Sequence, residues 1–442
     1  MIRRALSTVG LFLFAGCAFA ALPAFASSQA RIVRLSDVQG SVQIDKGIGQ
    51  GLENAFLNMP ITQGMQLKTK DTGRAEIEFE DGSTMRLTPN SSIRFSTLAV
   101  NDSGQRVSTI DLVEGLAYVD WLGKDDFSLN FSKEKVELTR AAHFRVDTAP
   151  EAAHLAVFKG DVDVEGPSGK LNLEKKKSAT FNPSEDDKST VASKISEEPF
   201  DGWDKESIQY HDQYAKNNQA NSPYGYGLSD LNYYGNYTMV PGYGMMWQPF
   251  FTGVGWDPFM DGMWGFYPGM GYMWASPYPW GWLPYRYGNW NFVPGMGWMW
   301  QPGAWNNWNM VPHYTPTTLT TMHAPVAPTG TTKTMFVGRA APTSTFASPR
   351  MVVNRGSAGM GIPRGSLYNL KDLNHQVTKS GFAQVRPAPQ FSASSGRNSA
   401  FGGGNRGASS GPSVGRSSMG ASSMSQASSA GHASTGGGAS HR

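Results

Sequence analysis

Alternation of apolar and charged residues is the feature that most constrains the fold. In the stretch GRAEIEFEDGSTMRL, which begins at Gly73, every second residue from Ala75 to Phe79 is apolar and the residues between them are charged. Successive side chains of a β-strand point to opposite faces, so this stretch predicts a strand with one apolar and one charged face. The Asp81-Gly82 pair that follows favours a tight hairpin turn.

A second pattern repeats along the same region. The segments VQGSVQI, LVEGLAYV and VFKGDVDV each join two strand-like halves through a glycine, at Gly40, Gly115 and Gly160. Short alternating segments separated by turn residues are typical of all-β proteins. We therefore predict an all-β domain of about a dozen short strands over residues 31–185.

Helical periodicity first appears in the stretch FDGWDKESIQYHDQYAKNN. It predicts one amphipathic helix near residues 200–218, inside a linker that spans residues 186–223. The stripe expected to pack on the β domain consists of Phe200, Trp203, Ser207, Tyr210 and Tyr214.

Five segments resemble, in order, the successive strands of the FecR-domain family: VRLSDVQGSVQI, PITQGMQLKTKDTGRAEIEFEDGSTMRLTPNSSI, TIDLVEGLAYVDW, AAHFRVDT and LAVFKGDVDV. The fourth departs from the family motif, with Ala141 or Ala142 where a glycine is usual. The resemblance implies an extracytoplasmic bacterial β domain that transmits or receives protein contacts. In the founding type, a cytoplasmic segment and a membrane helix precede this domain, and the protein controls a sigma factor. Only Met1–Arg4 precede the apolar run here, so we expect the domain to serve another purpose.

The N-terminus has the pattern of a cleavable secretory signal. Two arginines precede an apolar run and a small-residue AFA motif, so we expect residues 1–26 to be removed. Two alternatives are a lipoprotein anchored by lipid at Cys17 and an uncleaved membrane anchor. Cys17 is the only cysteine, so cleavage leaves no thiol for disulfides or zinc sites. No other apolar stretch approaches the roughly 20 residues of a membrane helix, and we expect no membrane span after cleavage.

A segment rich in glycine, proline and tryptophan occurs twice further along the chain. YGNYTMVPGYGMMWQP begins at Tyr234 and YGNWNFVPGMGWMWQP begins at Tyr287. A shorter unit, PGYGMMW, PGMGYMW or PGMGWMW, starts at Pro241, Pro268 and Pro294, which gives a repeat of about 26 residues. Residues 224–312 form this aromatic region. Its PWGWLPYRYGNW segment resembles one that follows the FecR domain in secreted bacterial proteins, where its function is unknown.

Two interpretations of these aromatic residues stay open. In the first, each repeat is a turn and a strand whose Trp, Tyr and Met side chains pack as core. In the second, flat aromatic faces form a ligand surface suited to sugar rings. The first candidates for that surface are Trp247, Trp274 and Trp300, which share one repeat position, and Trp282 and Trp290 join them.

The sequence contains no recognisable catalytic or metal-binding constellation. The histidines are scattered, and His143 falls in a strand pattern that favours a structural imidazole. The carboxylates of EIEFED could gather a hard cation such as calcium, but alternation on a solvated strand face explains them better. The GASSG match around Ser409 lies in low-complexity sequence. We predict no enzyme activity, no catalytic residue, no metal and no cofactor.

Residues 313–442 form a basic tail rich in Ser, Gly, Thr, Ala and Pro, with twelve lysines or arginines and one acid. Such a composition predicts disorder. One exception is Pro363–Val377, where Leu367, Leu370, Leu373 and Val377 share a helical face that could dock on a partner or on the body. Anionic envelope partners suit the positive charge, and no nucleic acid is expected outside the cytoplasm.

These observations together predict a non-enzymatic binding or scaffolding protein of the bacterial envelope, periplasmic or secreted to the cell surface. Its expected partner is an envelope polysaccharide or an envelope protein. The first alternative is a signalling component that senses a partner protein. The second is an envelope hydrolase, which would require carboxylates or histidines to converge in one pocket.

Overall fold

The computed structural model describes residues 31–184, 188–305, 308–317, 322, 325–330, 334–338 and 350–388. The predicted signal peptide, Cys17 and Ser409 lie outside these residues.

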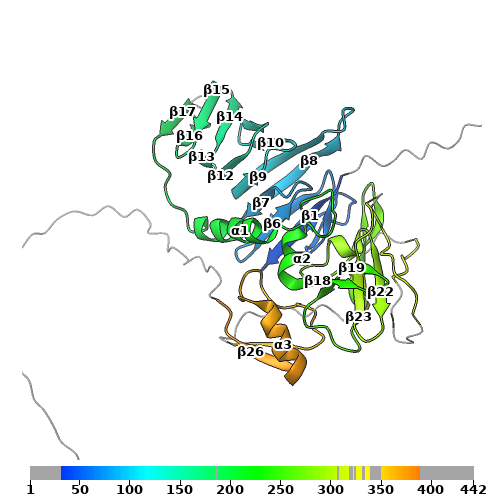
Figure 1. Ribbon diagram of the computed structural model, residues 1–442. Helices are drawn as coiled ribbons and strands as arrows, with labels where there is room; N and C mark the ends of the chain where they lie inside the picture. Colours follow the sequence, from blue (N-terminus) through cyan, green and yellow to red (C-terminus); the bar gives the residue numbers. More distant parts are fainter. Residues whose placement is uncertain are drawn as a thin grey trace, which may run out of the picture. The chain divides into compact units, whose positions relative to one another are not determined.

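Seventeen strands in the first part of the chain form two hydrogen-bonded sheets that share the long strand β9 (Arg106–Trp121) (Figure 1). Every pairing is antiparallel except that of β9 with β10. The first sheet contains β1 (Val33–Gln39), β4 (Pro60–Ile61), β6 (Arg74–Glu78), β7 (Thr84–Leu87), β12 (Ala142–Thr148), β13 (Ala153–Lys159), β16 (Ser178–Asn182) and β17 (Lys188–Ala192). The second contains β2 (Val42–Asp45), β3 (Leu52–Asn54), β5 (Gln66–Thr69), β8 (Ser92–Val100), β10 (Asp126–Phe131), β11 (Glu134–Leu138), β14 (Asp161–Gly166) and β15 (Gly169–Glu174). The all-β prediction is confirmed, and the strands outnumber the predicted dozen because several are only two to four residues long.

The three glycines at the centres of the strand repeats are the points where the chain passes from one sheet to the other. Before Gly115, strand β9 pairs with β8 of the second sheet, and after it β9 pairs with β12 of the first. Gly115 has a φ of 86°, and a Cβ there would lie 2.5 Å from the carbonyl oxygen of Asn90. Gly40 and Gly160 occupy the same kind of crossing, between β1 and β2 and between β13 and β14. Only glycine readily adopts a positive φ and leaves room for the neighbouring backbone, which explains why the motif repeats a glycine.

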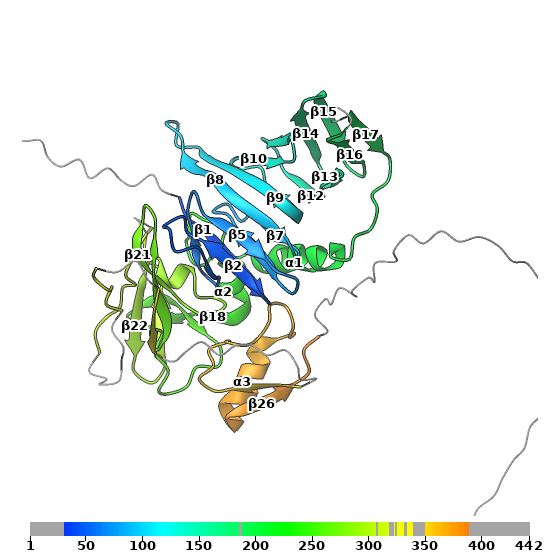
Figure 2. The ribbon, with the colours of Figure 1, turned by 180° about the vertical axis from the view of Figure 1, so that it is seen from behind.

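Both faces of strand β6 are buried. Ala75, Ile77 and Phe79 lie in the apolar core, as the alternation predicts. The prediction of a solvated face for the glutamates is wrong, since Glu76, Glu78 and Glu80 are at most 3% exposed. Helices α1 (Asp201–Tyr214) and α2 (Leu228–Tyr234) cover that face, and both views show them beside β1 and β7 (Figures 1 and 2).

Helix α1 confirms the predicted amphipathic helix. Trp203 and Tyr210 of the predicted stripe are buried. Helix α2 was not predicted, because its seven residues are too few to show a helical period.

The aromatic repeats are β-hairpins. They pair β18 (Gly235–Val240) with β19 (Gly244–Pro249), β20 (Asp261–Tyr267) with β21 (Gly271–Ala275), and β22 (Asn289–Val293) with β23 (Gly297–Gln301). In each PGxG turn both glycines have positive φ, as the turn requires. Strand β19 also pairs with β23, β20 pairs with β24 (Met335–Gly338), and a 3-10 helix, η1 (Leu283–Tyr285), lies between the second and third hairpins.

Each repeat also places a tryptophan directly over a glycine of the paired strand. A Cβ added to Gly262 would lie 2.0 Å from the Trp274 ring, and one added to Gly235 would lie 2.3 Å from the Trp247 ring. In the third hairpin the glycine lies just before β22: a Cβ added to Gly288 would lie 2.4 Å from the Gln301 carbonyl oxygen and 2.6 Å from the Trp300 Nε1. The repeated phrase therefore encodes a hairpin in which glycine makes room for an indole.

The prediction that disorder begins at residue 313 is wrong for residues 350–388, which form β25 (Met351–Asn354), α3 (Leu370–Ser380) and β26 (Phe382–Val385). Leu367, Leu370, Leu373 and Val377 are buried in the aromatic core. The predicted leucine-rich face thus docks back on the body. Burial of these apolar side chains offsets the conformational entropy that the segment loses on folding, although its overall composition is polar.

Candidate functional site

The five tryptophans predicted as a ligand surface are not exposed in this structure. Trp247, Trp274, Trp282, Trp290 and Trp300 all have 0% exposure and belong to the aromatic core. The hairpins turn four of these rings inward, and Trp282 precedes η1; the rings pack on other aromatic rings such as Trp280, whose centre lies 4.9 Å from that of Trp247. The prediction that these tryptophans form a ligand surface is therefore corrected: they are core residues, and a binding site has to lie elsewhere.

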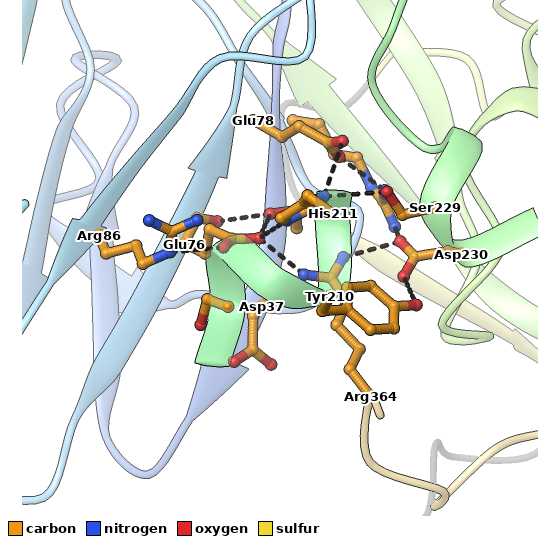
Figure 3. A network of polar contacts seen from close by, with 12 residues as sticks. Asp37, Glu76, Glu78, Arg86, Tyr210, His211, Ser229, Asp230 and Arg364 are labelled. Carbon is orange, nitrogen blue, oxygen red and sulfur yellow. Dashed lines mark hydrogen bonds and ion pairs between the residues drawn. The ribbon is translucent and has the colours of Figure 1, made fainter. Parts of the chain in front are cut away.

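Charged side chains instead converge on Glu76, in the space between the first sheet and α1 (Figure 3). Its carboxylate accepts hydrogen bonds from Arg86 Nε at 2.8 Å and Arg364 Nη1 at 2.7 Å. His211 Nε2 lies 3.0 Å away, and Ser36 Oγ donates at 2.8 Å. Burial alone would raise the pKa of Glu76, but His211, Arg86 and Arg364 outweigh it and hold the pKa well below its usual value.

Asp230 of α2 is the second centre of this ion-pair network. It contacts Arg34 Nη2 at 2.6 Å and Arg364 Nη2 at 2.7 Å, and it accepts a hydrogen bond from the Tyr210 hydroxyl. Burial opposes ionisation, yet Arg364 and Arg34 lower the pKa of Asp230. Arg34 also holds Glu78 at 2.9 Å. One arginine from the C-terminal segment, Arg364, thus bridges the β domain and α2.

The network reaches the far end of α1 through Asp204, which pairs with Arg86 at 2.9 Å. His143 Nε2 lies 2.8 Å from the same carboxylate, and its ring stacks on Phe158. The interpretation of His143 as a structural imidazole agrees with this geometry.

A histidine and several carboxylates therefore do converge, as the hydrolase alternative requires. His211 even lies between Ser229 Oγ, at 3.0 Å, and Glu76. Ser229 is only 1% exposed, however, and does not line the adjoining pocket. Glu76 and Asp230 are each held by two arginines, so the arrangement stabilises structure rather than presenting a free base. In the described part of the chain, no group of three or more His, Cys, Asp or Glu side chains could hold a metal ion.

A pocket of about 700 Å³ opens beside this network. The β domain contributes Asp37 and Arg74 to its wall, α1 contributes Trp203, and the C-terminal segment contributes Arg364 and Tyr368. Burial raises the pKa of Asp37, although Arg364 partly offsets the effect. Gln39 Nε2 donates to the same carboxylate at 2.8 Å. The pocket thus combines aromatic surface with acidic, basic and amide groups.

Sequence reasoning found neither the network nor the pocket. The only available signal was the row of glutamates in EIEFED, and nothing local to it indicates Arg364, 288 residues away.

Two family models match the chain. Residues 65–163 match the FecR protein family, and residues 228–330 match a family of unknown function, DUF6600. The chain carries a FecR domain followed by a DUF6600 domain. Glu76, Glu78 and Arg86 lie in the FecR match and Asp230 in the DUF6600 match, so the network joins both domains through α1 and through Arg364, which lies beyond either match. FecR-family proteins are associated with the cell envelope.

Two crystal structures of a candidate anti-sigma factor from Parabacteroides distasonis, at 2.50 and 1.65 Å resolution, also match part of the chain. Their sequence identities are 16% and 17%, and both give a TM-score of 0.26 over 29% of this chain and 59% of theirs. No curated protein matches. None of the helices in the described ranges has the length and apolar character needed to cross a membrane.

Proposed function

We propose that this chain is a non-enzymatic, extracytoplasmic binding protein of the bacterial envelope, and that its ligand enters the pocket between the FecR domain and α1. The observation that carries the proposal is the composition of that pocket, whose walls come from the β domain, α1, the DUF6600 domain and the C-terminal segment. Its volume of about 700 Å³ falls within the range typical of ligand sites.

The pocket walls suit a segment of envelope polysaccharide. Aromatic side chains line it, including Trp203, Tyr214 and Tyr368, and flat rings of this kind stack on the apolar faces of sugars. Glu206 and Gln213 offer acceptors and donors for hydroxyl groups. Tyr368 is 88% exposed, so it is free to cover a bound chain.

The pairing of the buried carboxylates supports a binding role without catalysis. A general base needs a pKa near the working pH and access to its substrate. Glu76 has a depressed pKa and is 2% exposed.

The test is cosedimentation of the purified protein with insoluble cell-wall and envelope polysaccharides. We expect Tyr368→Ala and Gln213→Ala each to weaken binding, about tenfold for the loss of an aromatic stack. Tyr243→Ala is the matched control, because Tyr243 is an exposed tyrosine that does not line the pocket. Unchanged binding by both pocket variants would refute a glycan site there.

The FecR match favours a second candidate, an envelope signalling component that senses a partner protein. A deletion strain would then show altered transcription of a sigma-dependent gene set. Restoration by the wild-type gene but not by the Tyr368→Ala gene would assign the pocket to signalling, whereas an unchanged transcriptome would remove this candidate.

A further inference from the structure

Arg286 in the DUF6600 domain is a buried cation with no hydrogen-bond or ion-pair partner among the described residues. It follows η1 and is 0% exposed, and among the described residues none of its three guanidinium nitrogens makes a hydrogen bond. Its guanidinium carbon lies 4.7 Å from the centre of the Trp282 ring. Stacking on an indole stabilises the charge in part, but it leaves all the N–H donors unsatisfied.

Other unsatisfied donors surround this guanidinium. The hydroxyls of Tyr226 and Tyr267 and the Nε1 of Trp282 are buried, and they have no hydrogen-bond partner in the part of the chain that the structure describes. The rings of Tyr226 and Trp282 lie 5.4 Å apart, and both phenols interact electrostatically with Arg286. Buried polar groups are almost always hydrogen-bonded. Several unsatisfied donors close together therefore indicate a shared acceptor.

No carboxylate supplies that acceptor among the described residues. Glu80 is held by Arg31 at 2.6 Å and Glu53 by Lys46 at 2.6 Å, so the nearby acids are already paired. Burial lowers the pKa of Arg286 to about 10, which still leaves the guanidinium charged at neutral pH. A charge buried without a counter-ion is strongly unfavourable.

We propose that Arg286, Tyr226, Tyr267 and Trp282 form a binding site for a small monovalent anion of the halide class. Guanidinium and indole N–H groups can only donate, and the phenols can donate, so the four side chains together suit an acceptor that carries negative charge. All four have 0% exposure, so an ion bound among them would be enclosed by protein, and we propose a small one because a larger anion would have to displace more of these packed rings. This site is separate from the pocket proposed for polysaccharide.

Thermal unfolding of the full chain tests the proposal, with sodium chloride as the probe. Ionic strength is held constant with sodium isethionate, whose anion is much larger than chloride. We expect Tm to rise by a few degrees with chloride and then to saturate, because a ligand that binds only the folded state stabilises it by mass action. Equal Tm values in the two salts would overturn the proposal.

Variants locate the effect. Arg286→Met removes the charge while keeping an unbranched apolar stem, and it should abolish the chloride response; Tyr267→Phe should weaken it. Arg94→Met is the control, because Arg94 is exposed. Should Arg286→Met fail to fold, an anomalous difference peak in bromide-grown crystals of the wild type, within hydrogen-bonding distance of Arg286, decides the matter. Absence of that peak would show that water alone satisfies these groups.

Discussion

Glu76, at the scale of single residues, illustrates why a charged strand face need not be solvated. The alternation in β6 correctly predicts two faces, but the second face is covered by α1. Glu76 on that face pairs with Arg86 of the neighbouring strand and with Arg364 from the C-terminal segment. Such pairs are costly to break from one side, since the remaining charges stay buried.

We therefore predict that Glu76→Gln lowers the free energy of unfolding by about 3–5 kcal/mol. Chemical denaturation at neutral pH measures this effect. Glu165→Gln, which removes an exposed partner of Lys170, should change stability by less than about 1 kcal/mol. Similar effects for the two variants would mean that the network contributes little.

The depressed pKa of the same carboxylate predicts that the stability of the protein depends on pH. The pKa of Glu76 is depressed in the folded protein, so its contribution is present above its unfolded pKa, near 4.5, and is lost as pH falls through the lower folded value. The stability difference between wild type and Glu76→Gln should therefore shrink below about pH 4.5. Denaturation at a series of pH values checks this, and a difference that grows towards acid would contradict it.

The glycines beneath the repeat tryptophans make a second prediction at this scale. Gly262→Ala places a methyl group 2.0 Å from the Trp274 ring and should cost about 1–3 kcal/mol through overpacking. Gly255→Ala is the control, because a Cβ there meets nothing within 4 Å and its φ is not positive. Thermal unfolding of both variants is the measurement, and equal Tm values would show that the aromatic core adjusts freely.

At the scale of elements, helix α3 shows how a short amphipathic segment gains order from a distant core. It begins after Asn369, whose side chain accepts a hydrogen bond from the backbone N–H of Asp372, and it ends at Gly381 in the left-handed conformation. These caps define its length, but helices of this size are marginal on their own. Burial of Leu370, Leu373 and Val377 supplies the rest.

Leu373→Ala should therefore loosen α3 and cost about 2–5 kcal/mol. Limited trypsin digestion followed by mass spectrometry should reveal faster cleavage at Lys371 and Lys379 on this helix. His375→Ala, an exposed change on the same helix, should leave the digestion rate unchanged. An unaltered cleavage pattern in Leu373→Ala would show that α3 is held by other contacts.

At the scale of the whole molecule, the two matched domains are joined by contacts that are as buried as the interior of either. Besides the ion-pair network, Asn58 of the β domain donates to the carbonyls of Ser276 and Tyr278 in the aromatic region. Tyr267 and Met273 of that region pack into the core of the β domain. All described residues fall within one compact unit.

We accordingly expect calorimetry to show one cooperative transition for both domains. Asn58→Ala and Arg34→Met, which remove contacts between them, should broaden or divide that transition. Two separate transitions in the wild-type protein would mean that the junction is weaker than its burial indicates.

The sequence by itself determined those features that depend on local periodicity and on backbone conformation. Strand alternation predicted the all-β class and the core residues of β6, aromatic spacing predicted α1, and the leucine spacing predicted the buried face of α3. The repeats around Gly40, Gly115 and Gly160 lie at the sheet crossings, but the sequence pattern did not indicate that the chain changes sheet there.

Only the tertiary structure decided which surfaces are covered. The tryptophans of the repeats are core because the hairpins fold inward, and the glutamates of β6 are buried because α1, α2 and Arg364 reach them from up to 288 positions away. Periodicity reports the two faces of an element but not what packs on each, because burial depends on contacts between segments distant in sequence. For the same reason, the pocket and the unpaired Arg286 could not have been found from any local pattern.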